Sequence, residues 1–371
     1  MKRVGFLSHL DLNLYLFRLP IMQALKRRGW EVYAIAPRGA YFDRFAEEGI
    51  ETISYEIDRA SLDPINELRA IRNIYKAIKP LHLDILHTFM AKPNIYGTVA
   101  GKMAKIPHII NLVEGLGSFY VEENLKAKAV RNLMEMLYKR TFKVSDACVF
   151  VNSDDPKYMV ERGIIAPHKV RVIKSVGIDT KRFAPENVKR IDFGTDKPVV
   201  MMVGRAIWHK GVREFYEAAA MLQDKAHFVY VGGTDRGNPS AASEEFLRNG
   251  VVEYLGHRDD VLDLIGSCDI FVLPSYREGL PRTLLEAAAL AKPLIATDTV
   301  GCRDVVRNGY NGFLVPSKDA KALAGAIEKL LTLPSLRKQM GEHARRYVTE
   351  HFALDKVVAN YLALYDEVLG V

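Results

Sequence analysis

Short apolar runs alternate with longer amphipathic segments through the first half of the chain. The runs are rich in Val, Ile, Leu and Phe, and they occupy residues 2–8, 31–36, 51–55, 83–87, 108–113 and 146–151. Runs of this kind, without polar alternation, are typical of strands buried on both faces of a parallel sheet. The helical spacing between them predicts helices that end at Gly29 and before Pro80. The first half therefore has the pattern of an α/β fold.

A second series of apolar runs follows a polar stretch that holds Gly177, Pro185 and Gly194 and lacks sustained periodicity. These runs occupy residues 199–204, 227–233, 251–256, 268–274, 292–298 and 312–316. Helical periodicity then continues from about residue 320 to the end of the chain. We expect an N-terminal domain, a C-terminal domain and a final helix that packs back towards the N-terminal domain, at residues 1–180, 190–350 and 351–371 respectively.

The two series predict the fold class, which is α/β with two Rossmann-like, doubly wound domains. The length of 371 residues agrees, because domains typically take about 100 to 200 residues each. Ligands of such sheets bind at the carboxyl ends of the strands. We therefore expect the two domains to face a central cleft that holds the ligand site.

Composition narrows the class of protein further. The 52 Lys and Arg against 45 Asp and Glu leave a formal charge of +7, which favours an anionic partner. No apolar run reaches the roughly 18 residues of a membrane span, and the start lacks a secretion signal, so we expect a cytoplasmic protein. Cys148, Cys268 and Cys302 are widely spaced and are expected to be reduced, structural thiols.

Candidate chemistry is densest in the segment LPSYREGLPRTLLEAAALAKP, residues 273–293. Pro281 suits the first position of a helix, whose free backbone N–H groups favour a phosphate. Glu278 and Glu286 place carboxylates on either side, and carboxylates accept hydrogen bonds from sugar hydroxyls. The pattern fits a nucleotide sugar. The alternative is a solvated pair around an ordinary helix start, because the same eight-residue spacing of glutamates recurs elsewhere in the chain.

The segment GRAIWHKG, residues 204–211, follows another apolar run directly. Arg205 and Lys210 can both reach the strand ends, where they would neutralise a diphosphate. The segment matches neither the Walker nor the GxGxxG phosphate-binding pattern, and isolated basic loop residues are often simply solvated. The chain also lacks a DxD triplet, an HExxH motif and a Cys/His cluster. We therefore expect no metal and no cofactor, and protein cations would meet the diphosphate charge.

Three segments together resemble the retaining GT-B glycosyltransferases of family 4 in order and spacing. They are GRAIWHKG, GHRDDVLDLIGSCDIFVLPSYREGLPRTLLEAAALAKPLIATD and GYNGFLVP. The resemblance implies a metal-independent hexosaminyltransferase. It also implies that Arg205 and Lys210 bind the donor diphosphate and support catalysis. By the same resemblance Glu286 binds the ribose, while Glu278 and the backbone of Gly279 and Leu280 bind the donor sugar.

The N-terminal half departs from the common pattern of that family. The loop after the first strand reads SHLDLNLYLFRLP and contains no glycine, which leaves the usual backbone contact to the donor phosphate without its residue. Where relatives carry a histidine near the reacting sugar, this chain has Glu114 in NLVEGLGSFY. Glu114 can orient a sugar hydroxyl or serve as a base for the acceptor. The alternative is a strand-end glutamate paired with a nearby arginine.

A narrower resemblance covers both halves of the chain. The segments GFLSHLDLNLYLFRLPI, LVEGLGSFY, AIWHKG and LPSYREGLP resemble family members that act in bacterial N-linked protein glycosylation. It implies UDP-N-acetylgalactosamine as the donor and undecaprenyl-diphosphate-linked N,N'-diacetylbacillosamine as the acceptor, joined by an α-1,3 linkage. It also implies work at the cytoplasmic face of the inner membrane. Arg18 and Lys92 are the expected partners of the acceptor diphosphate.

Residues 116–143 combine aromatic and aliphatic side chains with many basic ones. A basic amphipathic helix of this type binds an anionic membrane surface. The expected membrane contacts are Phe119, Tyr120, Lys126, Lys128 and Arg131. The alternative is a helix that packs on the core and exposes a solvated basic face.

Two other classes of function remain open from the residues alone. Two-domain α/β folds also host UDP-sugar epimerases and phosphorylases. A basic protein can also bind nucleic acid or anionic lipid without catalysis. The chain contains no nucleic-acid-binding motif, and we therefore expect no nucleic-acid partner.

Overall fold

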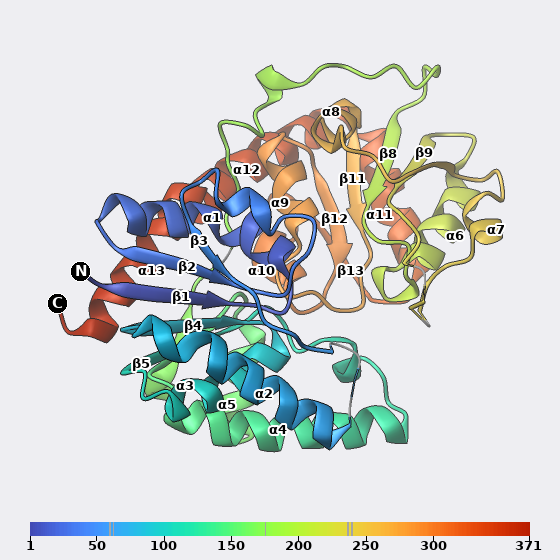
Figure 1. The fold of residues 1–371 in the computed structure, drawn as a ribbon. Coiled ribbons are helices and arrows are strands. Elements are labelled where there is room, and N and C mark those ends of the chain that lie inside the picture. The colour runs from blue at the N-terminus through green and yellow to red at the C-terminus, as the bar shows by residue number, and fades with distance from the viewer. Residues whose placement is uncertain (59–60, 62, 175, 236, 239) are drawn as a thin grey trace. The chain divides into compact units, whose positions relative to one another are not determined.

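The computed structural model of the chain describes residues 1–371 except 59, 60, 62, 175, 236 and 239. The chain divides into two units (Figure 1). The first unit contains Met1–Val176 and Val357–Val371, and the second contains Gly177–Lys356. Within the described residues, no helix has the length and apolar character needed to cross a membrane.

The first unit is built on a seven-stranded parallel sheet with the order β3-β2-β1-β4-β5-β6-β7. The strands are β1 (Arg3–Leu7), β2 (Glu31–Ile35), β3 (Glu51–Ile53), β4 (Ile85–Phe89), β5 (His108–Val113), β6 (Ala147–Phe150) and β7 (Val170–Val172). Strand β4 is buried along its whole length, as expected for a strand covered on both faces. The predicted strands of this half are confirmed. The sequence analysis missed β7, a half-exposed edge strand of three residues without an apolar run.

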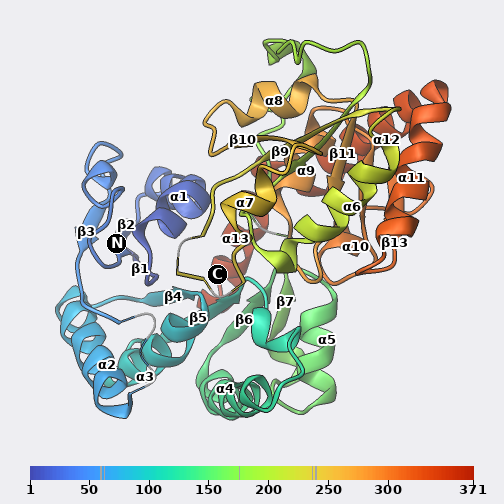
Figure 2. The same ribbon diagram turned by 90° about the vertical axis from the view of Figure 1, so that its right-hand side faces the viewer.

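Helices cover both faces of this sheet (Figures 1 and 2). They are α1 (Asp11–Arg27), α2 (Pro64–Ile78), α3 (Thr98–Met103), α4 (Leu125–Val144), α5 (Asp154–Glu161) and, from residue 357 onward, α13 (Leu354–Leu369). Asp63 caps α2 by accepting the backbone N–H of Asn66, and Asn124 caps α4 in the same way through Ala127. Short helical turns lie at Pro93–Gly97 and Ser118–Tyr120.

The second unit repeats the architecture with a six-stranded parallel sheet of order β10-β9-β8-β11-β12-β13. The strands are β8 (Val199–Val203), β9 (His227–Val231), β10 (Glu253–Gly256), β11 (Ile270–Leu273), β12 (Leu294–Thr297) and β13 (Gly312–Val315). Every predicted apolar run of this half forms one of these strands. The helices are α6 (Val212–Leu222), α7 (Glu244–Leu247), α8 (Val261–Ser267), α9 (Arg282–Ala289), α10 (Cys302–Val305), α11 (Ala320–Thr332) and α12 (Pro334–Phe352).

The strand order of both units is the doubly wound order in which the chain changes direction beside the first strand. This point lies between β1 and β4 in the first unit and between β8 and β11 in the second. Loops that follow those strands meet at the carboxyl edge of the sheet, which is where such folds bind their ligands. The expectation of two Rossmann-like domains is therefore confirmed, and the loops at the carboxyl ends of the strands in and beside these pairs are the places to look for a site.

Candidate active site

In the second unit, the loops after β8 and β11 are fastened to each other. The backbone N–H of Tyr276 donates to the carbonyl of His209 over 2.9 Å. Gly211 has a positive φ of 75°, and a Cβ at that position would meet the carbonyl of Pro274. Glycine is needed there because the two backbones approach too closely for a side chain. We call the segments 204–211 and 274–281 the paired loops.

The paired loops bring Lys210 and Glu278 into direct contact. The Lys210 ammonium donates to the Glu278 carboxylate over 2.6 Å, and the carboxylate is largely buried. A buried carboxylate requires a charged partner, and a lysine partner also leaves donors for a second anion. Two residues that the sequence analysis singled out from different segments therefore form one charged centre.

A turn after β12 supports the loop that carries Glu278. The backbone N–H of Glu278 donates to the carbonyl of Val300 over 3.1 Å, and Thr297 donates to the carbonyl of Ser275. Gly301 has a φ of 80°, and a Cβ there would meet the carbonyl oxygens of Glu278 and Gly279. This turn was not predicted from the sequence, although a glycine three residues after an apolar run was a usable signal.

Glu286 lies on helix α9, one turn beyond Arg282. Its carboxylate accepts a hydrogen bond from Arg282 Nε over 2.8 Å. Burial raises the pKa of Glu286, and the charge of Arg282 opposes that rise. Pro281 is the residue that precedes the helix rather than its first helical residue, a shift of one position from the prediction. Leu280 packs against the core of the unit.

Arg205 pairs with a residue that the sequence analysis did not consider. Its guanidinium donates to Asp235 over 2.9 Å, and its side chain is 66% exposed. Asp235 also accepts a hydrogen bond from Asn238, within a loop whose Ser240 carbonyl accepts the backbone N–H of Trp208. Asp235 therefore holds Arg205 at the surface beside the paired loops, where the guanidinium can also meet a solvent-borne anion.

In the first unit, Glu114 lies directly after β5 and is bonded to two residues of α1. Asn13 Nδ2 donates to both carboxylate oxygens, over 3.0 Å and 3.2 Å. The Arg18 guanidinium forms an ion pair with the same carboxylate. We call these three residues the Glu114 cluster. The arginine pairing considered for Glu114 is present.

Arg18 is a buried cation with 1% of its side chain exposed. Its guanidinium lies 5.0 Å from the centre of the Phe89 ring, whose other neighbours include His87. His87 Nδ1 is hydrogen bonded to the hydroxyl of Tyr365 over 2.7 Å. Burial and the charge of Arg18 hold the pKa of His87 well below its usual range, so this histidine is neutral. The Glu114 carboxylate thus lies beside one fixed positive charge and keeps part of its surface exposed.

The Asp11 carboxylate, and not a glycine, fixes the loop after β1. Asp11 accepts the backbone N–H of Tyr41 over 2.7 Å, and a Cβ at Gly39 would meet the Asp11 carboxylate. The loop after β1 is therefore tied to the loop after β2 by a side chain. In the segment SHLDLNLYLFRLP, which contains no glycine, the Asp11 side chain therefore makes the contact that fixes the loop.

Lys92 is engaged by the first unit itself. Its ammonium donates to the carbonyls of Asp58 and Ser61 over 2.9 Å and 2.7 Å, and to Glu67 over 2.7 Å. The three bonds match the three donors of an ammonium group. Lys92 thus links Asp58 and Ser61 to helix α2, and its charge already has an acidic partner.

The residues expected to touch a membrane fall into two groups. Phe119, Lys126 and Lys128 are exposed. Arg131 instead donates to the carbonyl of Glu122 over 3.1 Å and lies 5.4 Å from the centre of the Tyr120 ring. Arg131 and Tyr120 therefore contact each other and fasten the start of α4.

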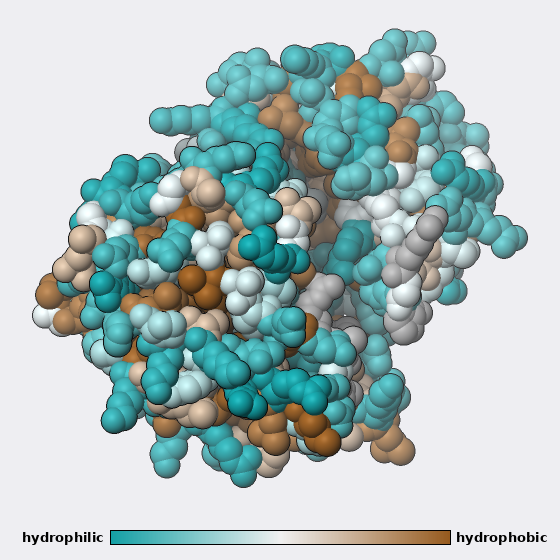
Figure 3. All heavy atoms as spheres, in the orientation of Figure 1, coloured by the Kyte–Doolittle hydropathy of each residue, from teal (hydrophilic) through white to brown (hydrophobic). Residues whose placement is uncertain are grey.

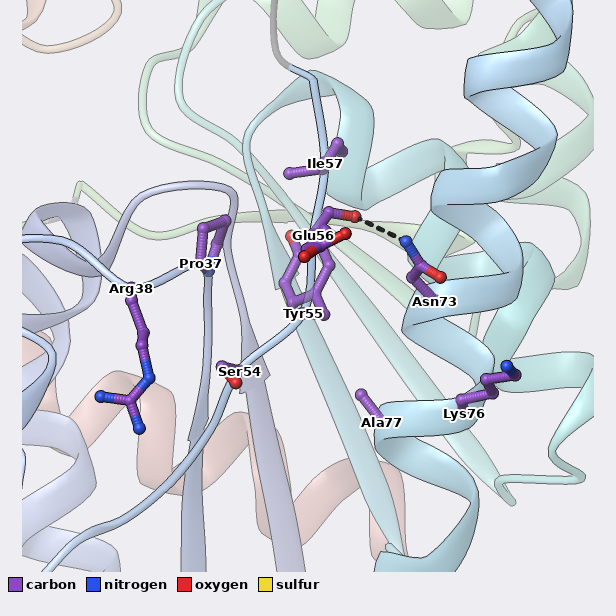
Figure 4. Close-up of a pocket in the computed structure, with 9 residues that line it drawn as sticks. All are labelled: Pro37, Arg38, Ser54, Tyr55, Glu56, Ile57, Asn73, Lys76 and Ala77. Atoms are coloured by element: carbon purple, nitrogen blue, oxygen red, sulfur yellow. Dashed lines mark hydrogen bonds between the residues drawn. The ribbon is translucent and has the colours of Figure 1, made fainter.

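A groove that the sequence analysis did not identify lies between the ends of β2 and β3 and helix α2. Its volume is about 730 Å³, and it is lined by Pro37, Arg38, Ser54, Tyr55, Glu56, Ile57, Asn73, Lys76 and Ala77 (Figure 4). Arg38 lies on one side of the 54–57 segment and Lys76 on the other. The Tyr55 hydroxyl donates to the carbonyl of Ser8 over 2.9 Å, which links the groove to the loop after β1.

Two family models match the two halves of the chain. The model described as glycosyl transferases group 1 matches residues 183–347, and the model described as glycosyl transferase 4-like matches residues 3–152. The first match covers the paired loops and helix α9, and the second covers the Glu114 cluster.

Individual relatives extend these matches over the whole chain. The N,N'-diacetylbacillosaminyl-diphospho-undecaprenol alpha-1,3-N-acetylgalactosaminyltransferase of Campylobacter jejuni is 44% identical, and the alignment covers 99% of each chain. The UDP-Gal:alpha-D-GlcNAc-diphosphoundecaprenol alpha-1,3-galactosyltransferase of Escherichia coli is 26% identical over 81% of this chain and 80% of its own.

Solved structures share the fold of the chain. A glycosyltransferase from Rickettsia africae superposes with a TM-score of 0.78 at 23% identity, covering 99% of this chain and 98% of its own. The Anabaena HepE protein, solved in complex with UDP, has a TM-score of 0.77 at 16% identity, covering 99% and 100%. With a relative this similar along its entire length and family models on both units, the chain belongs to the GT-B glycosyltransferases of family 4.

Proposed function

We propose that this glycosyltransferase moves N-acetylgalactosamine from UDP-N-acetylgalactosamine to undecaprenyl-diphosphate-linked N,N'-diacetylbacillosamine, in an α-1,3 linkage. The 44% identity to the Campylobacter jejuni transferase over 99% of both chains supports this pair of substrates. The observation that carries the proposal is the Lys210–Glu278 contact at the change of direction between β8 and β11. At that point, a cation can bind the diphosphate of a sugar nucleotide while the neighbouring carboxylate accepts hydrogen bonds from its sugar hydroxyls.

The donor is held by the second unit in this proposal. Lys210 and Arg205 bind the diphosphate, and Lys210 meets the charge that develops on UDP as it leaves. Glu278 and the backbone of Gly279 and Leu280 bind the sugar hydroxyls, and Glu286 accepts hydrogen bonds from the ribose. The binding of an anion by Lys210 leaves its pair with Glu278 in place, since an ammonium group has three donors.

The acceptor is served by the Glu114 cluster. The Glu114 carboxylate accepts a hydrogen bond from a hydroxyl of the acceptor or donor sugar. Arg18 and Asn13 already donate to this carboxylate and hold it in position. We therefore assign Glu114 to orienting a hydroxyl, and we assign Arg18 to holding Glu114. Lys92 binds Asp58, Ser61 and Glu67 and contributes to acceptor binding through these residues.

The bond changes balance without an added base. The bond between the anomeric carbon and the diphosphate oxygen breaks, and a new bond forms to the acceptor oxygen on the same face, so the configuration is retained. The acceptor proton passes to the departing diphosphate oxygen. Lys210 stabilises the negative charge on that oxygen, and preorganised charges of this kind typically contribute several kcal/mol.

An acceptor with a polyprenyl chain requires the enzyme to work at a lipid surface. We propose that it does so at the cytoplasmic face of the inner membrane. The exposed side chains of Phe119, Lys126 and Lys128 support this location, because aromatic and basic groups are favoured at an anionic interface.

UDP release tests the proposal directly. We expect release from UDP-N-acetylgalactosamine that depends on a short-chain polyprenyl-diphosphate-linked diacetylbacillosamine and persists in EDTA. UDP-N-acetylglucosamine and UDP-galactose serve as matched donors that differ in one hydroxyl or in the acetamido group. Release that favours another donor or acceptor would overturn the assigned substrates. Loss of activity in EDTA, restored by a divalent metal, would overturn the metal-independent mechanism.

A further inference from the structure

Helices α2, α3 and α4 lie side by side on one face of the first unit's sheet (Figures 1 and 2). Together they form a continuous layer, with α3 in contact with both of its neighbours. The surface of this layer differs from an ordinary solvated face in both its charge and its apolar content.

The charge of the layer is almost entirely positive on its outer side. Helices α2, α3 and α4 contain only two acidic residues, Glu67 and Glu135. Glu67 is occupied by Lys92, while Glu135 is buried and accepts hydrogen bonds from Tyr158 and Arg162. The exposed basic residues are Arg69, Arg72, Lys76, Lys102, Lys126, Lys128, Lys139, Arg140 and Lys143.

Within the part of the chain that the structure describes, none of the basic residues on the outer side of α4 has an ion pair. These are Lys126, Lys128, Lys139, Arg140 and Lys143. The other charged residues of the helix are Glu135, which is buried, and Arg131, which is half-buried and donates to the carbonyl of Glu122. The outer face of α4 therefore offers uncompensated positive charge to a partner.

Large apolar side chains emerge among these bases on all three helices. Leu125 is 85% exposed, Leu68 is 68% exposed and Ile65 is 65% exposed. Further members are Val99, Met103, Leu133 and Met136. Figure 3 shows hydrophobic residues between hydrophilic ones along the lower part of the first unit, over α2 and α4. Exposed apolar groups of this number on one layer mark an interaction surface rather than scattered surface residues.

We propose that the α2–α3–α4 layer as a whole, and not α4 alone, is the surface that lies on an anionic lipid bilayer. Anionic headgroups complement the bases, each worth about 1 kcal/mol near the surface, and the apolar side chains enter the acyl boundary. A second copy of the chain would bring like charges together. The backbone of a nucleic acid would leave Leu125 and Leu68 exposed. This proposal rests on the proposed function in one respect only: the lipid-linked acceptor is the reason why the enzyme needs a lipid surface.

Binding of the full chain to vesicles tests this layer. The vesicles are phosphatidylcholine alone and phosphatidylcholine mixed with phosphatidylglycerol, and co-sedimentation gives the partition coefficient. The test variants are I65E/L68E on α2, M103E on α3 and L125E/L133E on α4. Met221, which is 50% exposed on α6 of the second unit, supplies the matched control M221E. All these side chains are exposed, so thermal unfolding should stay near that of the unmodified chain.

We expect I65E/L68E and L125E/L133E each to lower partitioning into the anionic vesicles by about tenfold, with a smaller loss for M103E and none for M221E. Added salt should weaken binding of the unmodified chain. Loss confined to the α4 variant would overturn the three-helix surface, as would equal losses for M221E. Equal binding to neutral vesicles would overturn the anionic requirement, and a preference for duplex DNA over vesicles would overturn the lipid partner.

Vesicle binding needs no acceptor, so this test is separate from that of the proposed function. UDP release with a short-chain acceptor in solution should be unchanged in all the variants, because none of them alters the paired loops or the Glu114 cluster. An unmodified chain that binds vesicles but releases no UDP would contradict the proposed function without contradicting the lipid-binding role of the α2–α3–α4 layer.

Discussion

The paired loops and the Glu114 cluster both lie at the carboxyl edge of a doubly wound parallel sheet, yet they are built differently. The paired loops combine partly exposed charges with close backbone contacts that need glycine, at Gly211 within the loops and at Gly301 in the turn that supports them. The Glu114 cluster contains no glycine, and its central cation, Arg18, is buried. One region is shaped by its backbone, and the other by buried side chains.

This difference determines how each region should respond to substitution. A site formed by loops can lose a charge without losing its fold, because its main contacts are between backbone atoms. A buried ion pair cannot lose one partner in that way, since the other is left uncompensated. Substitutions in the paired loops should therefore change activity more than stability, although the loss of Lys210 leaves the largely buried Glu278 carboxylate without its partner and should lower stability modestly. Substitutions in the Glu114 cluster should change both activity and stability strongly.

The largest effect is expected for Arg18→Met. This substitution leaves Glu114 beside an apolar side chain, and removal of one partner of a buried pair typically costs about 3 to 5 kcal/mol. Urea unfolding measures the loss of stability. Adding Glu114→Gln should recover part of it, because the double variant has no uncompensated charge. An R18M chain as stable as the unmodified one would show that the cluster is not held by this pair.

Lys210→Ala should lower kcat by about 100-fold to 1000-fold, the typical cost of removing one group that stabilises developing charge. The matched control is Lys225→Ala, which removes a more exposed ion pair with Glu328 in the same unit. UDP release and thermal unfolding give the two readouts. Near-normal turnover of K210A would remove Lys210 from the catalytic assignment, whereas a matching loss in K225A would point to a general effect.

Gly301→Ala should raise the KM for the donor by about tenfold, because its Cβ displaces the carbonyls of Glu278 and Gly279. Gly309→Ala is the control. Gly309 has a similar φ of 78°, but no atom lies within 4 Å of its added Cβ. Both variants place an alanine at a positive φ, so a much larger rise in KM for Gly301→Ala points to the displaced loop. Equal effects of the two substitutions would argue that strain, and not the position of Glu278, is responsible.

The smallest effect is expected for the pH dependence that Glu286 confers. The charged carboxylate is the form that accepts two hydroxyl hydrogen bonds, and burial raises its pKa. As the pH falls, donor affinity should therefore decline by a few-fold at a higher pH than an ordinary carboxylate would cause. Glu286→Gln should bind donor more weakly at neutral pH but without this pH dependence. KM measured against pH gives the comparison.

The raised pKa of Glu286 changes stability with pH in the direction opposite to its effect on donor affinity. The folded chain holds the Glu286 proton more tightly than the unfolded chain, so stability falls as the pH rises from the unfolded to the folded pKa. Glu286→Gln should therefore unfold no more easily than the unmodified chain at neutral pH. A large loss of stability in E286Q would contradict this and would show that the bond with Arg282 outweighs burial.

The sheets could be predicted because every strand except β7 coincides with a local apolar run. β8 and β11 are buried along their whole length and consist of apolar residues only, so no polar position obscures the pattern. The edge strand β7 escaped prediction for the converse reason. Its three residues are half-exposed, and its pairing with β6 is decided by the neighbouring strand rather than by its own composition.

The candidate donor residues were also accessible from the sequence, since Glu278 and Glu286 lie in one segment that follows a recognisable strand. The distant partners of Arg205 and Glu114 were not. Asp235 pairs with Arg205 across 30 positions, and Arg18 pairs with Glu114 across 96. No local pattern joins such residues, because the order of strands in the sheet is what brings their loops to one edge.

The sequence by itself determined the parallel sheets, the loops that carry charge and the family of the chain, because each depends on contiguous residues. Tertiary structure decided which charges are partnered and which are free to serve a ligand. Lys92 is the clearest instance. Its sequence position at the end of β4 favours an anion site, and the fold instead gives its three donors to Asp58, Ser61 and Glu67. The partner of a charged side chain is whichever group the packing of the fold places within hydrogen-bond distance. That packing depends on the whole sheet and not on the neighbouring residues in the sequence.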